Sequence, residues 1–467
     1  MIIFAAGAEA YVEGGADGQR DTADIALPAV AGATGVAART DAWARRDHRY
    51  GWEAVCDAAG ENGAVVPSPR SGAGAGAGFS AGGSCYISCA IELSTVSPAA
   101  PLIIAEIAGA GGQWFHGWVV RVQTGGAWEL TDAVGTVKAT WPAPGLAPDA
   151  KYWLLFHFDE QADRLRLWAA GEDPAAPGRL AMPSDWNEGR EKISYQQNHA
   201  GGFASVALGG RNYPKTNANA TVRCDSIVYS AVKPLQPVVV ALAALTGDGY
   251  YAGALTEWLK GGGGAASYTE IDDPLTAAPD GDTTHIRCVP GANRTDRYSA
   301  SHESAAAIGV APGDAILAVL ALANRKRAPG GGAIGTAYTF LRYSGIDDGG
   351  GQPDAWVDAG NYQTAWHAYA TAPDGSAWTA ASFDATEWGV VYENSVLASI
   401  EWRVTWGGLY VAYQKAAPFV AQPPDAASMR PSAGFGASAL PGRPARGASA
   451  ARPAVAAKVE GGRRKKE

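Results

Sequence analysis

Four aspartates around a proline-containing turn are the residues of this sequence best suited to bind a metal ion. They are Asp272, Asp273, Asp280 and Asp282. Ca²⁺ takes roughly six to eight oxygen ligands, which aspartate-rich loops can provide. The spacing fits no EF-hand loop, and ordinary Asx-type turns account for the same residues. We therefore expect no metal and no other cofactor, with a structural Ca²⁺ at these four aspartates as the alternative.

Aromatic residues close to predicted turns suggest a second kind of chemistry, the recognition of sugars. Trp114, Trp118 and Trp128 lie within one short stretch of chain. An indole face can stack on the CH groups of a sugar ring, and the flat surface of a β-sandwich is a suitable platform. The chain has 16 Trp, however, and most of them must fill a core or a subunit contact. Burial is therefore the stronger interpretation, and sugar binding is the alternative.

No pattern of residues points to catalysis. The seven histidines are dispersed, and none lies at metal-ligand spacing from a cysteine or from another histidine. His157 stands within an apolar stretch and is predicted to be a hydrogen-bonded core residue. The acids at Asp159–Glu160 and Glu270–Asp273 fall at predicted strand ends or turns, where they are solvated. We expect a protein that is not an enzyme.

Charge is divided unevenly along the chain. The net charge is −9, yet the residues from Pro418 onward carry nine Lys or Arg against three acids. The acidic balance of the remainder disfavours nucleic-acid binding. The basic segment is rich in Pro and Ala and has no apolar periodicity, so it cannot fold alone. We expect it to lie on an acidic neighbouring copy, with Phe419 and Phe435 as anchors and a terminal basic cluster of Arg463, Arg464, Lys465 and Lys466.

The elements that must position these residues have the patterns of β-strands. Tyr and Trp are abundant and there are only 3 Met, which favours β-structure over helical bundles. Alternation of period two marks strands at 86–93, 118–123 and 164–168. Residues 152–158 are apolar almost throughout, as in a strand covered on both faces, and a polar turn joins them to 164–168 as a hairpin. Residues 315–322 could form a helix or a strand, and a strand that ends at the basic run 324–327 is predicted because a tight turn at 312–314 directly precedes them.

Composition also predicts the order of the domains. Residues 1–232 and 238–416 are each expected to form an antiparallel β-sandwich, joined by a proline-containing linker at 233–237 and followed by an irregular extension at 417–467. The longest aliphatic run, Val238 to Leu245, is far shorter than the ~20 residues of a membrane helix. The opening residues lack the pattern of a signal peptide. We therefore expect no membrane insertion and synthesis in a cytoplasm.

Two resemblances follow from these segments. The run Tyr152 to Glu172, together with the later segments 207–211 and 224–230, resembles the strands of concanavalin A-like or laminin-G-like domains. Segments within 238–415, including Ala311 to Arg327 and the terminal strand Gly408 to Tyr413, resemble a jelly-roll-like β-sandwich found in proteins of tailed phages. The second resemblance implies an accessory module on a virion and transfers no catalytic residues. The paired acids of concanavalin-like glycosidases, arranged Glu-x-Asp-x-Glu, are missing from the first.

These observations predict a non-enzymatic structural protein of a phage or phage-like particle. It would decorate the capsid or belong to the tail, would be made in the host cytoplasm, and would have other virion proteins and copies of itself as partners. The alternative is a carbohydrate-binding adhesin that recognises host-surface glycans. A glycoside hydrolase is a third interpretation, which would need two carboxyl groups about 5–10 Å apart in a groove.

Overall fold

The chain divides into two units, Met1–Ala417 and Pro418–Glu467. The computed structural model describes residues 2–6, 29–30, 37–40, 51–56, 64–66, 84–95, 98–109, 118–132, 136–141, 151–159, 164–170, 191–192, 203–209, 220–232, 234, 238–252, 258–260, 268–271, 284–288, 294–327, 336–349, 363–394 and 401–416. The basic extension with its predicted anchors, Phe419 and Phe435, and its terminal cluster therefore lies outside the described residues. Its predicted role as an assembly element stays a prediction.

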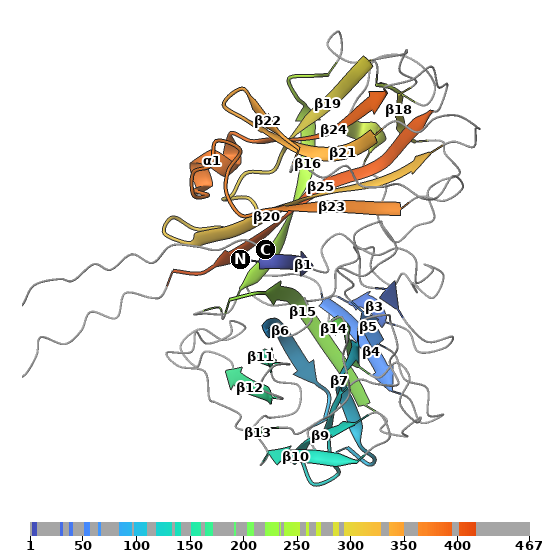
Figure 1. Cartoon of the computed structure of the whole chain (residues 1–467), viewed down its shortest axis with the longest axis vertical. Coiled ribbons are helices and arrows are strands. Elements are labelled where there is room, and N and C mark those ends of the chain that lie inside the picture. Colours follow the sequence, from blue (N-terminus) through green and yellow to red (C-terminus); the bar gives the residue numbers. More distant parts are fainter. Residues whose placement is uncertain are drawn as a thin grey trace, which may run out of the picture. The chain divides into compact units, whose positions relative to one another are not determined.

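The protein is all-β, as predicted, and its sheets are antiparallel (Figure 1). In the described part of the chain, helical structure consists of the 3-10 turn η5 (Tyr268–Glu270) and the short helix α1 (Ala380–Asp384). No described helix combines the length and the apolar character that crossing a membrane requires. Strands up to Ser230 form two sheets, and strands from Val239 onward form a third. The linker at 233–237 remains a prediction.

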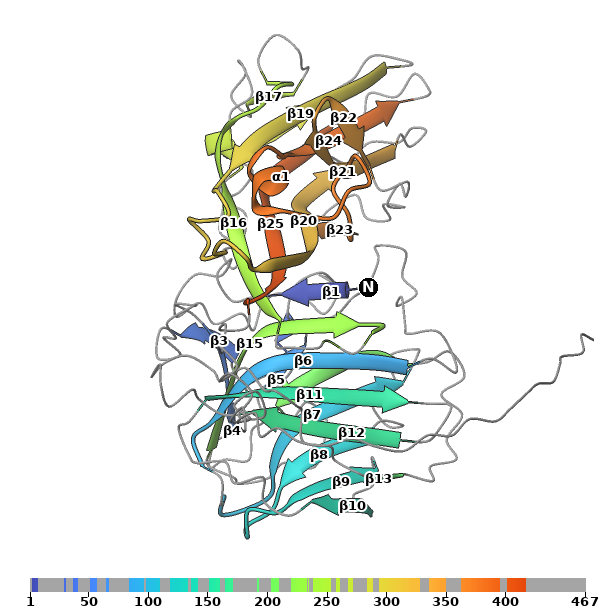
Figure 2. The same cartoon turned by 90° about the vertical axis from the view of Figure 1, so that its left-hand side faces the viewer.

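The first sandwich consists of an eight-stranded and a seven-stranded sheet (Figure 2). The eight-stranded sheet has the order β13 (Glu191–Lys192), β12 (Arg164–Ala170), β11 (Lys151–Asp159), β6 (Ser84–Leu93), β15 (Ala220–Ser230), β4 (Gly51–Cys56) and β3 (Ala37–Thr40), and β1 (Ile2–Ala6) also pairs with β15. The seven-stranded sheet has the order β10 (Val137–Trp141), β9 (Trp128–Asp132), β8 (Trp118–Val122), β7 (Leu102–Gly109), β14 (Phe203–Gly209), β5 (Ala64–Val66) and β2 (Ala29–Val30).

The apolar strand at the centre of the first sandwich behaves as its sequence predicts. Residues 152–157 of β11 are all buried, and β11 pairs with β12 as a hairpin in which Asp159 lies opposite Arg164. His157 is a core residue, since it is buried and its ring stacks on that of Tyr86 with centroids 4.1 Å apart. Burial of aliphatic and aromatic side chains on both faces of this strand supplies much of the driving force for folding the domain.

The second sandwich is built from one continuous ten-stranded sheet that folds over itself. Its order is β17 (Leu259–Lys260), β18 (Ile286–Cys288), β25 (Trp402–Gln414), β16 (Val239–Asp248), β19 (Arg294–His302), β24 (Glu387–Asn394), β21 (Thr336–Tyr343) and β22 (Ile346–Asp348), while β20 (Ala315–Arg327) pairs with β25 and with β23 (Gln363–Tyr369).

A single strand connects the two layers of this second sandwich. The first part of β16, Val239–Ala244, pairs with β25. Its last part, Leu245–Asp248, pairs with β19 after a break in register between Leu245 and Gly247. Bulges of this kind bend a strand and increase its twist, which lets one strand belong to both layers. The residues that follow β16 are thereby placed on the β19–β24–β21–β22 layer.

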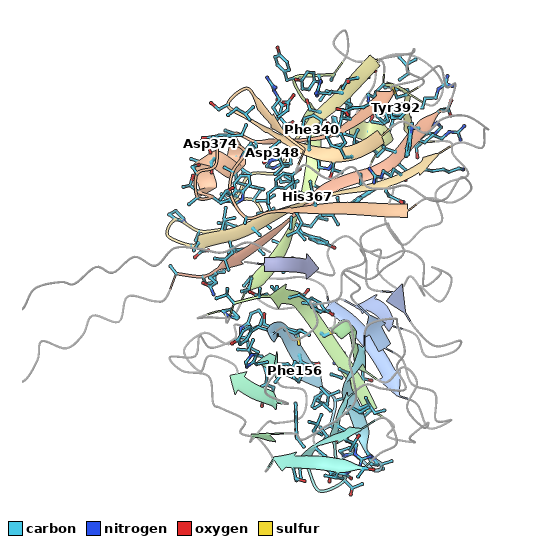
Figure 3. The ribbon with its side chains drawn as sticks, in the orientation of Figure 1. Phe156, Phe340, Asp348, His367, Asp374 and Tyr392 are labelled. Carbon is cyan, nitrogen blue, oxygen red and sulfur yellow. The ribbon has the colours of Figure 1, made fainter. Side chains whose placement is uncertain are left out.

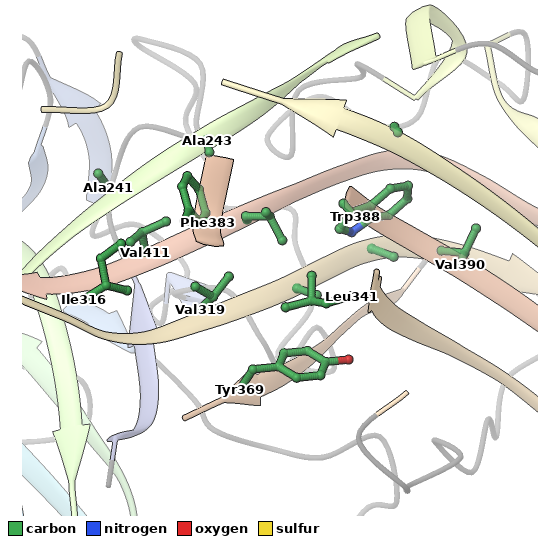
Figure 4. Close-up of a cluster of buried hydrophobic side chains, with 14 of the residues drawn as sticks. Ala241, Ala243, Ile316, Val319, Leu341, Tyr369, Phe383, Trp388, Val390 and Val411 are labelled. Atoms are coloured by element: carbon green, nitrogen blue, oxygen red, sulfur yellow. The ribbon is translucent and has the colours of Figure 1, made fainter. Parts of the chain in front are cut away.

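The core of the second sandwich lies between these two layers (Figure 4). Val319 of β20 and Val411 of β25 meet Trp388 and Val390 of β24 there, and Phe383 of α1 joins the cluster. The indole of Trp388 donates its hydrogen bond to the carbonyl of Leu322, 2.8 Å away, so burying this polar group leaves it satisfied.

Strand β20 differs from the prediction at its end. The basic run was expected to stop the strand, yet β20 continues to Arg327 because this run pairs with β25 up to Trp402. Arg325 is buried and donates through Nη1 to the carbonyl of Ala337, 2.8 Å away. A guanidinium that donates to a buried carbonyl oxygen can lie inside a sheet, so a charged residue does not by itself mark the end of a strand.

Candidate functional site

Most residues singled out from the sequence lie outside the part that the structure describes. Trp114 and all four aspartates of the predicted calcium site, Asp272, Asp273, Asp280 and Asp282, belong to this group, so both predictions stay untested. For Trp118 the structure describes the backbone, in β8. Within the described residues, no group of three His, Cys, Asp or Glu is placed to hold a metal ion.

Trp128 requires a correction. Its side chain is 1% exposed and belongs to the core of the first sandwich, where the residue pairs with Val122. An indole that contributes this much apolar area stabilises the domain most when it is buried. Trp128 therefore offers no exposed face for a sugar, in agreement with the stronger of the two interpretations of the tryptophans.

The described residues do contain an exposed aromatic site, on the outer face of the β19–β24–β21–β22 layer. It is built on a turn that directly follows β16, comprising Gly249, Tyr250, Tyr251 and Ala252, here called the tyrosine turn. The N–H of Ala252 donates to the carbonyl of Gly249, 3.2 Å away, and closes the turn. Tyr250 is 55% exposed, which makes it one of the few large exposed apolar side chains in the described part of the molecule.

Two residues of the sheet fix the backbone of the tyrosine turn. The N–H of Gly249 donates to the carbonyl of Ser299 at 2.8 Å. The N–H of Tyr250 donates to Oε2 of Glu387 at 2.9 Å, and that of Tyr251 donates to Oγ of Ser299 at 3.0 Å. The Ser299 hydroxyl in turn donates to Glu387 Oε2 at 2.7 Å. Three consecutive amides are thus satisfied, which holds the turn rigidly on the sheet.

Glycine at position 249 is a requirement of this packing. A Cβ atom added there would lie 2.7 Å from Glu387 Oε2, 2.7 Å from Ser299 Oγ and 2.9 Å from the Ser299 carbonyl carbon. A real Cβ atom almost never has non-bonded contacts this short, and one of them is with the backbone of Ser299, which cannot move aside as a flexible side chain can. The absence of a side chain at Gly249 therefore lets the turn lie against β19.

A tight hairpin supplies the charged half of the site. Strands β21 and β22 are joined by the two residues Ser344 and Gly345, whose φ angles of 52° and 82° are those of the turn that suits the twist of a hairpin. The hairpin sets Arg342 opposite Asp347. On its other edge β21 pairs with β24, which sets Arg342 opposite Glu387 as well. Figure 3 shows the neighbouring Phe340 and Asp348 on the same part of the molecule.

The carboxylate of Asp347 interacts with three side chains, two arginines and one tyrosine. Arg342 Nη1 lies 2.7 Å from Oδ1, and the hydroxyl of Tyr251 donates to Oδ2 at 2.5 Å. Arg297 Nε lies 3.5 Å from the same Oδ2. Arg342 also donates to the Tyr251 hydroxyl at 3.3 Å. Desolvation opposes the charge of Arg342, but the hydrogen bond and the charge of Asp347 outweigh it and raise the pKa of the guanidinium.

The two tyrosine rings occupy different environments. The guanidinium of Arg342 lies over the ring of Tyr250, 4.0 Å from its centroid, in a cation–π contact. The ring of Tyr251 packs against the buried Phe340, with centroids 6.1 Å apart. Burial and the contact with Asp347 raise the pKa of Tyr251, so its hydroxyl stays protonated at neutral pH. Tyr251 therefore has a structural role that holds the turn in place, while Tyr250 presents its ring to solvent.

Several polar atoms of the site are available to a ligand. Within the described part of the chain, Oε1 of Glu387, the two Nη atoms of Arg297 and the hydroxyl of Tyr250 have no hydrogen-bond partner. Next to the exposed ring, the carboxylate oxygen can accept a hydrogen bond, the guanidinium nitrogens can donate, and the tyrosine hydroxyl can do both. This combination of one aromatic face and a few convergent polar groups is the usual composition of a small-ligand site.

This site was not predicted from the sequence, although the sequence contains one signal of it. Gly249, Tyr250 and Tyr251 follow an aliphatic strand directly, and two adjacent tyrosines in a turn are unusual because turns favour small polar residues. The partners Ser299, Arg342 and Glu387 carry no local signal. They are brought together only by the pairing of β19 and β21 with β24.

Comparisons with known proteins find only distant similarities to solved structures. The sequence matches no protein-family model and no curated protein. Similar solved structures include a sialidase from Trypanosoma rangeli (10% identity, 39% of this chain and 25% of the other, TM-score 0.26), the cellulose induced protein Cip1 (13%, 44% and 93%, 0.29) and basic winged bean lectin in complex with Tn-antigen (11%, 40% and 90%, 0.25).

These neighbours include a sialidase and a lectin. This chain spans about a quarter of the length of the sialidase. At these identities and TM-scores the similarity carries no argument about the site or the activity of this protein, which rest on its own residues.

Proposed function

We propose that this protein is a non-enzymatic carbohydrate-binding protein, and that the tyrosine turn with its charged partners is the binding site. The observation that carries the proposal is the half-exposed ring of Tyr250, covered on one face by Arg342 and bordered by available hydrogen-bonding atoms. A pyranose ring has an apolar face of CH groups and a rim of hydroxyls. The first suits stacking on tyrosine, and the second suits the acceptor of Glu387 and the donors of Arg297.

The environment of the carboxylates supports binding over hydrolysis. A glycosidase needs one carboxyl group that protonates the leaving oxygen and another that attacks the sugar or activates water. Both oxygens of Asp347 already accept from Arg342, Tyr251 or Arg297. Oε2 of Glu387 accepts from the backbone of Tyr250 and from Ser299. These groups fix the site, which is why we propose no reaction.

The variant Tyr250→Ala tests the proposal. The full chain is first screened on an array of neutral and acidic glycans, and the strongest ligand is then titrated by calorimetry. We expect Tyr250→Ala to weaken binding at least tenfold and Tyr250→Phe to weaken it about threefold or less, because phenylalanine keeps the stacking face. Val232→Ala is the matched control, since Val232 is another large exposed side chain. Unchanged binding by Tyr250→Ala, or no glycan bound at all, would contradict the proposal.

A role in a phage or phage-like particle is the second proposal, and it is compatible with glycan binding on a particle surface. It is supported by the contrast between the basic segment from Pro418 onward and the acidic remainder. Because Met1–Ala417 is a compact unit by itself, deletion of 418–467 should leave it folded and weaken incorporation into particles, most strongly at high salt. Equal copy numbers with and without the segment would show that it is not an assembly element.

A further inference from the structure

We infer, on the basis of the proposed function, that the site binds a single pyranose unit of a neutral, soluble saccharide and does not bind along the flat surface of a polysaccharide. The inference concerns the size and the charge of the ligand. It follows from the angle between the two tyrosine rings, from the occupied face of Tyr250 and from the balance of charges around the turn.

The two tyrosines do not form a flat platform. Their ring planes are inclined by 86° and their centroids are 5.0 Å apart. Binding along a flat polysaccharide requires aromatic rings that lie in one plane, so that successive sugar units stack on successive rings. Here a sugar that lies flat on Tyr250 meets Tyr251 edge-on. Tyr251 therefore acts as a side wall, and it cannot rotate freely because its hydroxyl is bound to Asp347 and its ring packs on Phe340.

At most one face of Tyr250 is open to a ligand. The guanidinium of Arg342 occupies the other face, and it is held there by its ion pair with Asp347 at 2.7 Å. The described residues thus provide one stacking position, bounded on one side by Tyr251. This arrangement suits the ring of one sugar unit, and further units of a chain would extend away from the stacking position.

The charges of the site favour a neutral ligand. Two guanidiniums, Arg297 and Arg342, face two carboxylates, Asp347 and Glu387, so the cluster has no net charge. Asp347 engages both arginines, whereas Glu387 keeps Oε1 free toward a ligand. A sugar hydroxyl can donate to that oxygen, but the carboxylate of a uronic acid would meet it as a like charge.

The test compares saccharides of increasing length, using the full chain and calorimetry. The probes are the methyl glycosides of glucose, galactose and mannose, the corresponding linear oligosaccharides of two to five units, glucuronate and galacturonate. We expect the affinity to rise with length no more than in proportion to the number of sugar units, because any one unit can occupy the single stacking position on Tyr250 and the other units add no contacts. A gain of tenfold or more between one and three units would overturn the single-unit inference and leave carbohydrate binding itself intact.

The acidic probes test the other half of the inference. We expect each uronate to bind at least tenfold more weakly than its neutral counterpart, and Glu387→Gln to reduce that ratio because the like charge is removed. Glu303→Gln is the matched control, since Glu303 also accepts a backbone N–H, that of Ala244, but lies outside the site. Tighter binding of a uronate than of its neutral counterpart would overturn the neutral-ligand inference. If none of these probes binds although the array identifies another glycan, this inference fails and the proposed function stands; if no glycan binds at all, both fail.

Discussion

The two sandwiches use charged residues in opposite ways. In the first, Arg121 pairs with Glu129 across neighbouring strands, and Arg223 pairs with Glu92 in the same manner. Each of these pairs lies within its own sheet, and its charges serve the pairing of two strands. In the second sandwich, Arg342 lies between Asp347 and Glu387 on three adjacent strands, beside a turn that presents a ring to solvent. The ion pairs of the first sandwich stabilise strand pairing, whereas the charges around Arg342 also border an exposed aromatic ring.

The strongest test of this contrast is the removal of one member of a pair in the first sandwich. Glu92 has a side chain that is only 4% exposed, so Arg223→Ala leaves a buried carboxylate without its ion pair. We expect a loss of about 2–3 kcal/mol in the free energy of unfolding, measured with denaturant, and no change in saccharide binding. The double variant Arg223→Leu with Glu92→Leu should recover most of the loss. A glycan-binding defect in the single variant would contradict the separation of the two regions.

The next largest effect is expected from Gly249→Ala in the second sandwich. The added methyl group would overlap Ser299 and Glu387, so the tyrosine turn must move away from the sheet. We expect a cost of about 1–3 kcal/mol in unfolding free energy, as for other overpacked sites, and at least a tenfold loss of saccharide binding. Gly125→Ala is the control, because no atom lies within 4 Å of a Cβ added there. Full binding by Gly249→Ala would show that the close approach of the turn is not required.

A smaller effect concerns the alkaline limit of stability. Burial, followed by the hydrogen bond to Glu393, raises the pKa of Tyr338 to about 12. Because the folded state holds this proton more tightly than the unfolded chain, the stabilisation is complete below pH 10 and is lost as the pH rises through about 12. Tyr338→Phe should therefore reduce the fall in melting temperature above pH 10. The pKa itself is measured from the difference in tyrosinate absorbance between the natural chain and the Tyr338→Phe variant, and a value near 10 for Tyr338 would contradict this prediction.

Much of the fold could be predicted because strand patterns are local. The alternation at 86–93 and the apolar run at 152–158 both lie in strands, as predicted. Alternation is typical of a strand with one exposed face, however, and that expectation is wrong for 86–93, because Ser88 and Glu92 are as buried as their apolar neighbours. The end of β20 could not be predicted in this way. Arg325 lies inside the sheet because the carbonyl of Ala337 accepts its hydrogen bond, and Ala337 belongs to another strand.

The site was missed for the same reason. The predicted sugar-binding tryptophans were selected for being aromatic and close to turns, but Trp128 is buried because its strand faces the core at that position. Tyr250 is exposed because Ser299 and Glu387 hold its turn on the outer face of the sheet. Residues 250, 299 and 387 meet only after three strands have paired, and nothing near any one of them in the sequence indicates the other two.

The passage of β16 from one layer to the other has a consequence for folding. Its first half needs β25, which is the last described strand of the chain, and its second half needs β19. Contacts between segments so far apart in sequence form late, because closing the long intervening loop costs conformational entropy before the contacts can stabilise the fold. An intermediate that has assembled only the layer of β25 and β20 has no support for the tyrosine turn, because Ser299 of β19 and Glu387 of β24 hold it. Ligand binding at Tyr250 would thus report that β19, β24, β21 and β22 have reached their native pairing, and chains in which only the other layer has formed would not bind the ligand.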